Sequence, residues 1–134
     1  MAYLVGIVIA LVVSLSATFV GFDKDRAFYP TVLAVIASYY VLFAVMGGSI
    51  ETVLVELAVM SVFIGVAVLG FKRNLWFVVA ALLVHGIFDF VHGHFVPNPG
   101  VPIWWPMFCL AYDFAAAVYL SWLLHQSRVA MNAR

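Results

Sequence analysis

Ionisable side chains are gathered in a stretch that reads as the outer half of a membrane helix, "LLVHGIFDFVHGHFVPNPG", residues 82–100. This stretch contains His85, Asp89, His92 and His94, although the whole chain has only 6 basic residues, 6 acidic residues and 4 histidines. A helix turns by about 100° per residue, so Asp89 lies about 40° and His92 about −20° from His85. These three side chains therefore share one narrow helix face. His94 points about 180° away from it, and we expect it to be an interfacial residue or an outer partner of the site.

The column formed by His85, Asp89 and His92 has the chemistry of a metal site. Imidazole and carboxylate are ligands of zinc and non-haem iron, and the spacing lets two or three of these side chains reach a common point. The segment "DFVH" is also an acid-x-x-His pair, as found in metal sites of helical bundles. No second pair of this kind occurs in the neighbouring apolar runs. The sequence therefore predicts one transition-metal ion, zinc or iron, rather than a di-iron centre.

Two acids from other apolar runs are expected to face this column. Counting helical turns places Glu56 near the depth of Asp89, and Asp113 near the depth of His85. Each charge at the centre of a membrane helix costs about 2.5–3.5 kcal/mol on insertion scales. We therefore expect both acids to join the column at one interior site, where Glu56 or Asp113 completes the metal shell or acts as the catalytic general base. Cys109, one turn from Asp113, is either a packing residue or a further ligand.

These residues must be positioned by membrane-spanning helices. Of the 134 residues, 67% are hydrophobic and 9% are charged, whereas a typical soluble domain is about a quarter charged. A helix needs about 20 apolar residues to cross the hydrocarbon, and short polar breaks divide the chain into five such runs. The sequence thus predicts a single all-α domain, 1–134, that is an integral membrane bundle of five transmembrane helices. The predicted spans are residues 3–21, 28–46, 50–71, 75–95 and 103–125.

The basic residues predict the orientation of these spans. They occupy the first loop, the third loop and the C-terminal tail, which all lie on one side of a five-span bundle, and they are Lys24, Arg26, Lys72, Arg73, Arg128 and Arg134. The second and fourth loops contain no lysine or arginine. The positive-inside rule then places the N-terminus outside and the C-terminus in the cytoplasm.

The last third of the chain resembles a family of small bacterial membrane proteins of unknown function. Members of that family have a late helix with His, Asp and His, then an Asn-Pro turn, then a Cys ahead of an Asp. The matching residues here are His85, Asp89, His92, Asn98, Pro99, Cys109 and Asp113. The resemblance implies a multi-span protein of the bacterial inner membrane and marks the same polar residues, but it implies no activity.

Three classes of function fit these residues. The first is a metal-dependent intramembrane enzyme that acts on a lipid, isoprenoid or quinone-like substrate in the outer half of the bundle. The second is a proton or metal-ion pathway that uses the same residues as a relay. The third is a non-catalytic membrane subunit or binding module whose polar column joins helices. We expect membrane lipids and an apolar small molecule as partners, no nucleic acid, and a homo-oligomer or a subunit of a membrane complex.

Overall fold

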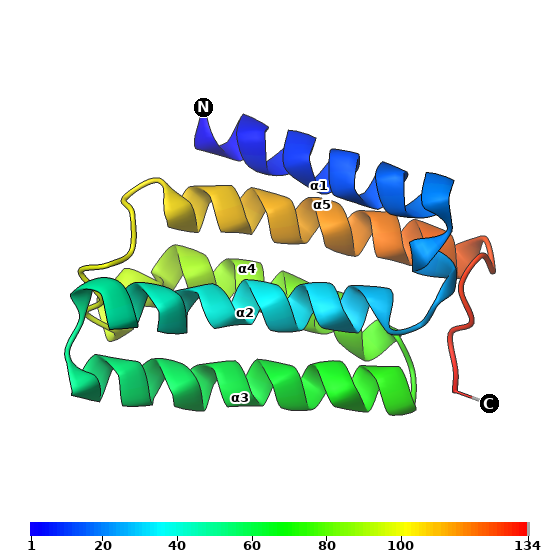
Figure 1. The fold of residues 1–134 in the computed structure, drawn as a ribbon. Helices are drawn as coiled ribbons and strands as arrows, with labels where there is room; N and C mark the ends of the chain where they lie inside the picture. Colours follow the sequence, from blue (N-terminus) through cyan, green and yellow to red (C-terminus); the bar gives the residue numbers. More distant parts are fainter. Residues whose placement is uncertain (134) are drawn as a thin grey trace.

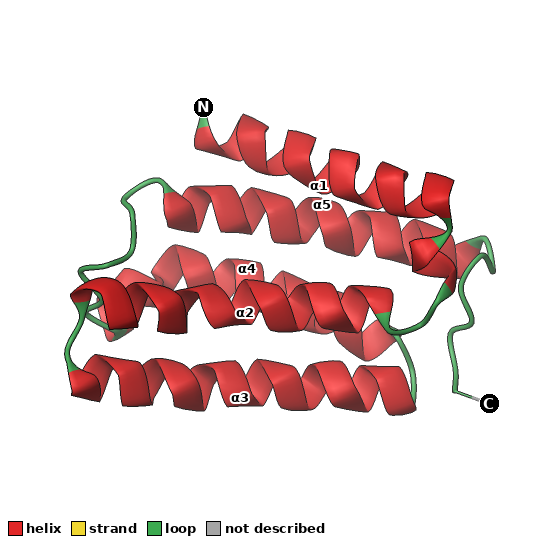
Figure 2. Cartoon of the chain, in the orientation of Figure 1, coloured by secondary structure: helices red, strands yellow, loops and turns green. Residues whose placement is uncertain are grey.

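The computed structural model describes residues 1–133, so Arg134, the last residue of the predicted basic tail, lies outside the described part. Within residues 1–133 the chain forms five long α-helices and one turn of 3-10 helix (Figures 1 and 2). They are α1 (Ala2–Val20), η1 (Phe22–Lys24), α2 (Phe28–Gly47), α3 (Ile50–Lys72), α4 (Trp76–Phe95) and α5 (Trp105–His125). All five α-helices are long and apolar enough to cross a membrane, which confirms the predicted number of candidate spans and the all-α class.

The helix ends follow from local sequence signals. Helix α1 ends at Gly21, whose φ of 94° is a left-handed conformation that glycine adopts without strain. Ser49 caps α3, because its hydroxyl accepts a hydrogen bond from the Thr52 backbone N–H at 3.2 Å. Pro106 lies in the first turn of α5, where a backbone N–H would have no partner within the helix.

The helices pack in a defined order that leaves α1 at one edge. Helix α1 packs along α5, α5 packs along α4, and α2 packs along α3, as Figure 1 shows. Two glycines permit the closest of these contacts. A Cβ atom on Gly6 would lie 2.4 Å from the Phe108 carbonyl oxygen, and one on Gly86 would lie 3.1 Å from Cβ of Asp113. Helix α5 is therefore held tightly against both α1 and α4, and the contact at Gly86 sets the distance between α4 and Asp113.

The described basic residues lie at one end of the bundle. In Figure 1 the α1–α2 connection, the α3–α4 connection and the C-terminal tail all lie at that end. Arg26 joins them, because its guanidinium donates to the backbone carbonyls of Phe71 at 2.7 Å and Gly70 at 3.2 Å, and also to the carbonyl of Ala130. The Leu75 N–H donates to the Met131 carbonyl at 2.9 Å. The tail is thereby fastened across the α3–α4 turn.

Candidate functional site

The buried polar residues of α4 lie on the helix face that the sequence predicts. His85, Asp89 and His92 are all among the buried residues of α4, with relative exposures of 2%, 0% and 2%. His94 is exposed, and its imidazole lies 3.3 Å from the Val91 carbonyl of its own helix. The column therefore faces the interior of the bundle, and His94 does not belong to it.

An inner group forms where α4 meets α5. The Nδ1 atom of His85 lies 2.8 Å from Oδ2 of Asp113 and 3.4 Å from Oδ2 of Asp89. One ligand atom from each of the three residues lies within 4.8 Å of the other two, and all three side chains are buried. Phe63 of α3 covers the imidazole of His85 edge-on, with ring centroids 4.6 Å apart. We call His85, Asp89 and Asp113 the inner group.

The carboxylates of the inner group are short of hydrogen bonds. Both oxygens of Asp89 and the Oδ1 atom of Asp113 are buried without a hydrogen-bond partner among residues 1–133. A buried polar atom normally has a partner, because its desolvation costs about 1–3 kcal/mol when it has none. Three unpartnered carboxylate oxygens within one small group are therefore an exception, which a bound cation or a proton on a carboxylate would relieve.

The spacing of the inner group fits a metal ion. In a metal site with metal–ligand distances of about 2.0–2.1 Å, neighbouring ligand atoms lie about 2.8–3.4 Å apart. Octahedral geometry gives the lower end of this range and tetrahedral geometry the upper end. The distances from His85 Nδ1 to Asp113 and to Asp89, 2.8 and 3.4 Å, fall at the two ends of that range, and the ligand oxygens of Asp89 and Asp113 lie within 4.8 Å of each other. Three protein ligands with a fourth position open for water is also the usual composition of a catalytic zinc site.

A second, outer group joins α4 to α3. The Nε2 atom of His92 lies 2.8 Å from Oε1 of Glu56, which is 1% exposed. The side-chain amide of Asn98 donates to the same Glu56 oxygen at 2.9 Å and to the Tyr40 carbonyl oxygen at 3.1 Å. His92, Glu56 and Asn98 therefore form an outer group in which the acid has two partners, although its Oε2 atom has none within the described chain.

The α4–α5 connection is folded onto the outer group by close backbone contact. A Cβ atom on Gly100 would lie 1.9 Å from the Phe43 carbonyl oxygen, so only glycine fits at this position. The Gly100 N–H lies 3.3 Å from Oδ1 of Asn98, and the Thr52 hydroxyl donates to the Pro97 carbonyl at 3.3 Å. The segment after α4 thus covers the ends of α2 and α3 and brings Asn98 over Glu56.

Two further residues lie close to these groups: Tyr40, which was not predicted as a site residue, and Cys109, for which the sequence left packing and ligand roles open. The Tyr40 ring of α2 packs on His92 with centroids 4.2 Å apart, and its hydroxyl is buried without a hydrogen-bond partner among the described residues. Cys109 is buried on α5, one turn before Asp113. A tyrosine in an apolar run is usually a packing residue, so only its depth would have suggested a role.

The structure thus divides the five predicted site residues. Asp113 joins His85 and Asp89, as its predicted depth indicates, while Glu56 pairs with His92, one turn away from Asp89. His92, predicted as the third metal ligand, is not a member of the inner group, which is the only metal-compatible group of three or more such residues within the described part.

Comparison of the chain with models of known families, with curated proteins and with solved structures finds no match in any of the three. The interpretation of the site therefore depends on its own geometry.

Proposed function

We propose that this protein is a metal-dependent intramembrane enzyme whose metal is bound by His85, Asp89 and Asp113. The observation that carries the proposal is the inner group, a fully buried imidazole and two carboxylates with three unpartnered oxygens. Asp113 is the third metal ligand in this proposal, whereas the spacing of residues on α4 alone predicts His92 in that role.

The charge of the inner group supports a divalent ion. Two ionised carboxylates and a neutral imidazole carry a charge of −2, and a divalent cation brings the total to zero. A buried charge is tolerated when it is paired or coordinates a metal. Imidazole with carboxylates suits zinc and iron, and such an ion would make a nucleophile of a bound water at neutral pH.

The inner group itself and the residues around it supply the remaining parts of the proposed catalytic site. The Oδ1 atom of Asp113 and the second oxygen of Asp89 have no hydrogen-bond partner in the described chain, so either carboxylate can take a proton from a reacting water. Phe63 and the surrounding apolar helices keep bulk water away. The substrate of a site enclosed in this way within apolar helices is an apolar molecule that enters from the bilayer, such as a lipid, an isoprenoid or a quinone.

The proposal includes an orientation. With the basic end of the bundle in the cytoplasm, the N-terminus lies outside and the α4–α5 connection faces the outer surface. The inner group then lies near the middle of the membrane, and the outer group lies between it and the outer surface. The location that agrees with this orientation and with the resemblance is the bacterial inner membrane.

A second candidate is a proton or metal-ion pathway. It is favoured by the two His–carboxylate pairs, His85 with Asp113 and His92 with Glu56, which follow each other along α4 with Tyr40 packed on His92. Histidine and carboxylate exchange protons readily near neutral pH, and such residues mark ion paths in membranes. A path of this kind would also use Glu56, which the enzyme proposal leaves outside the metal shell.

Metal analysis of the purified protein separates these functions. The protein is prepared without chelator, its metal is counted by elemental mass spectrometry, and zinc and iron are titrated back after chelation. We expect one ion per chain in wild type and none in His85→Ala. If wild type contains no stoichiometric metal and binds none on titration, the enzyme proposal fails. Proton flux into liposomes that is lost in Glu56→Gln would then favour the pathway, and no flux would favour a non-catalytic subunit.

A further inference from the structure

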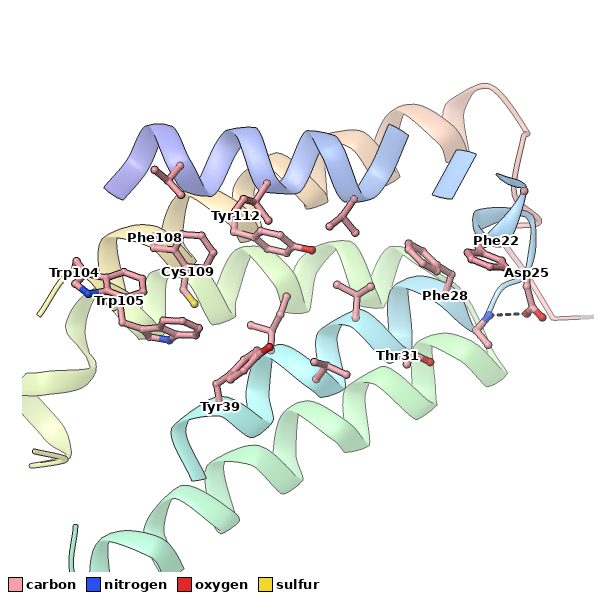
Figure 3. Close-up of a pocket in the computed structure, with 18 residues that line it drawn as sticks. Phe22, Asp25, Phe28, Thr31, Tyr39, Trp104, Trp105, Phe108, Cys109 and Tyr112 are labelled. Atoms are coloured by element: carbon pink, nitrogen blue, oxygen red, sulfur yellow. Dashed lines mark hydrogen bonds between the residues drawn. The ribbon is translucent and has the colours of Figure 1, made fainter. Parts of the chain in front are cut away.

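Helix α1 has an apolar groove on each of two sides. The larger groove, about 980 Å³, lies between α2 on one side and α1 with α5 on the other, and Cys109 forms part of its lining (Figure 3). Asp25 is the only charged residue that lines it in the described part, so its lining offers no cation. The smaller groove, about 630 Å³, lies between α1 and α5. On α1, Val5 lines the larger groove and Ile7 the smaller one, and two residues correspond to a rotation of about 200°.

The smaller groove has the length and the surface that suit one lipid chain. Its lining extends from Ile7 to Leu15 on α1 and from Ala111 to Trp122 on α5, and the α5 part is about 16 Å long. This length is about half of the hydrocarbon thickness of a bilayer. Val118, in the α5 wall, is 66% exposed, so the groove is open to the bilayer along its side.

The hydroxyl of Tyr119, which lines the smaller groove, is already engaged. It lies 2.8 Å from Oγ1 of Thr18, and the Thr18 hydroxyl donates to the buried carboxylate of Asp23. Because a hydroxyl has a single proton to donate, Tyr119 is the donor in its bond with Thr18. No lysine or arginine of the described chain lines the groove. A negatively charged head group therefore finds no partner within the groove and must be bound at its end.

An arginine lies at the end of the groove that is nearest the basic end of the bundle. The guanidinium carbon of Arg128 lies 4.8 Å from the ring centroid of Trp122, where the lining on α5 ends. Arg128 is exposed, and its side chain forms no ion pair with a carboxylate among residues 1–133. A guanidinium that lies over an aromatic face keeps the N–H groups at its edge, which can bind a phosphate with two parallel hydrogen bonds.

The turn after α5 fixes the position of this arginine. Ser127 has a left-handed φ of 53°, and its N–H donates to the Leu124 carbonyl at 3.1 Å. The Arg128 N–H donates to the Leu123 carbonyl at 3.0 Å, which completes the pair of bonds known as the Schellman motif. The next residue, Val129, is 3% exposed and packs in the hydrophobic core. The backbone of Arg128 is thus held on both sides.

We infer that the smaller groove binds one anionic phospholipid, with an acyl chain between α1 and α5 and its phosphate at Arg128. Lipid tails are as apolar as the groove, so the chain alone gains little on entering it. The contact between the phosphate and the guanidinium provides the preference, and a zwitterionic lipid gains less because its own ammonium group offsets the charge of its phosphate. The site goes beyond the proposed function, since the lining contains no residue of the inner group.

Native mass spectrometry of the full-length protein tests this inference. The protein is released from nanodiscs that contain equal amounts of phosphatidylglycerol and phosphatidylcholine with the same chains, and the lipids retained per chain are counted. We expect one retained phosphatidylglycerol in wild type. Arg128→Gln should lower the ratio of bound phosphatidylglycerol to phosphatidylcholine about fivefold, which corresponds to one contact between a basic residue and anionic lipid.

A matched variant controls for the general attraction of anionic lipid to the basic end. Arg73 is also exposed at that end, but it follows α3, which lies at the other edge of the bundle from α1 in Figure 1. Arg73→Gln should therefore leave the lipid ratio unchanged, and Arg128→Lys, which keeps the charge, should retain most of the preference. An unchanged ratio in Arg128→Gln, or an equal decrease in Arg73→Gln, would overturn the inference.

A second pair of variants tests the place of the acyl chain. Val118 lines the groove and is 66% exposed, whereas Val62 lies on α3 outside the groove and is 65% exposed. Val118→Trp should fill the groove and abolish the retained phosphatidylglycerol, while Val62→Trp should have no effect. If Arg128→Gln lowers retention but Val118→Trp does not, the arginine binds a head group or free phosphate without the groove, and the inference fails.

The outcomes are independent of the proposed function. None of these substitutions alters His85, Asp89 or Asp113, so the metal content should be the same in all variants. A protein that retains phosphatidylglycerol through Arg128 but binds no metal would refute the enzyme and leave the lipid site. Stoichiometric metal without this lipid preference would refute the lipid site and leave the enzyme.

Discussion

The substitution Asp89→Asn gives opposite results for a metal site and for a structural polar column. Neither oxygen of Asp89 has a hydrogen-bond partner among residues 1–133, so the amide replaces the carboxylate without breaking a hydrogen bond. It removes one of the two negative charges of the inner group and one of its three ligand atoms. We therefore expect metal binding to fall sharply while the chelated protein loses no stability.

Both effects can be estimated from the structure. Loss of a group that merely orients a ligand lowers metal affinity about 10- to 100-fold, so loss of a ligand itself should cost at least about 100-fold, or about 2.7 kcal/mol. The ligand oxygens of Asp89 and Asp113 lie within 4.8 Å of each other. Two ionised carboxylates at that distance repel by about 3.5 kcal/mol at an effective dielectric constant of about 20. The amide removes this repulsion, so the chelated variant should unfold at the same temperature as wild type or higher.

Two measurements on detergent-solubilised protein test the prediction. Zinc affinity is measured by titration against a competing chelator, and unfolding is followed by tryptophan fluorescence on heating with and without excess chelator. Glu51→Gln, which neutralises an exposed carboxylate in the first turn of α3, is the matched control and should change neither quantity by much. If chelated Asp89→Asn unfolds at a clearly lower temperature than wild type and zinc affinity is unchanged, the carboxylate serves helix packing and the metal site is refuted.

Three further predictions address the packing of the site, the outer group and the orientation. Gly86→Ala places a methyl group 3.1 Å from α5 and should weaken zinc binding about tenfold or more in the same titration, whereas Gly65→Ala, with nothing within 4 Å of the new Cβ, should leave binding unchanged. Asn98→Ala removes hydrogen bonds to a carboxylate on α3 and a carbonyl on α2, so the free energy of unfolding should fall by about 1–3 kcal/mol with the metal content intact. In intact cells a membrane-impermeant maleimide should label Pro99→Cys but not Arg73→Cys, and the reverse result would overturn the orientation.

Most of the fold could be predicted from the sequence, because membrane helices are encoded locally. A run of apolar residues of sufficient length between polar breaks identifies each span without knowledge of its neighbours. The observed helices begin and end within two residues of the five predicted runs. The buried face of α4 was predictable for a similar reason, since the positions of His85, Asp89 and His92 on one face depend only on helical geometry.

The partners of that face were less predictable, because they depend on which helices are neighbours and how far each is shifted along its axis. A shift of one turn, about 5.4 Å, is enough to pair Glu56 with His92 instead of Asp89. Asn98 reaches Glu56 only because Gly100 lets the segment after α4 lie against α2. The groove beside Cys109 depends on the separation of α2 from α1 and α5. None of these relations leaves a periodic pattern in the sequence.

The contrast between the two polar groups supports the proposal that the inner group carries the chemistry. In the outer group one acid meets one histidine and an amide donor, so a single charge has two partners and the arrangement can join α3, α4 and the following segment without further ligands. In the inner group two acids share one histidine, and Asp89 and Asp113 retain unpartnered oxygens. Joining α4 to α5 would require only the bond between His85 and Asp113. Asp89 therefore adds a second costly carboxylate that packing alone does not require, and a divalent cation is the ligand that would compensate its charge.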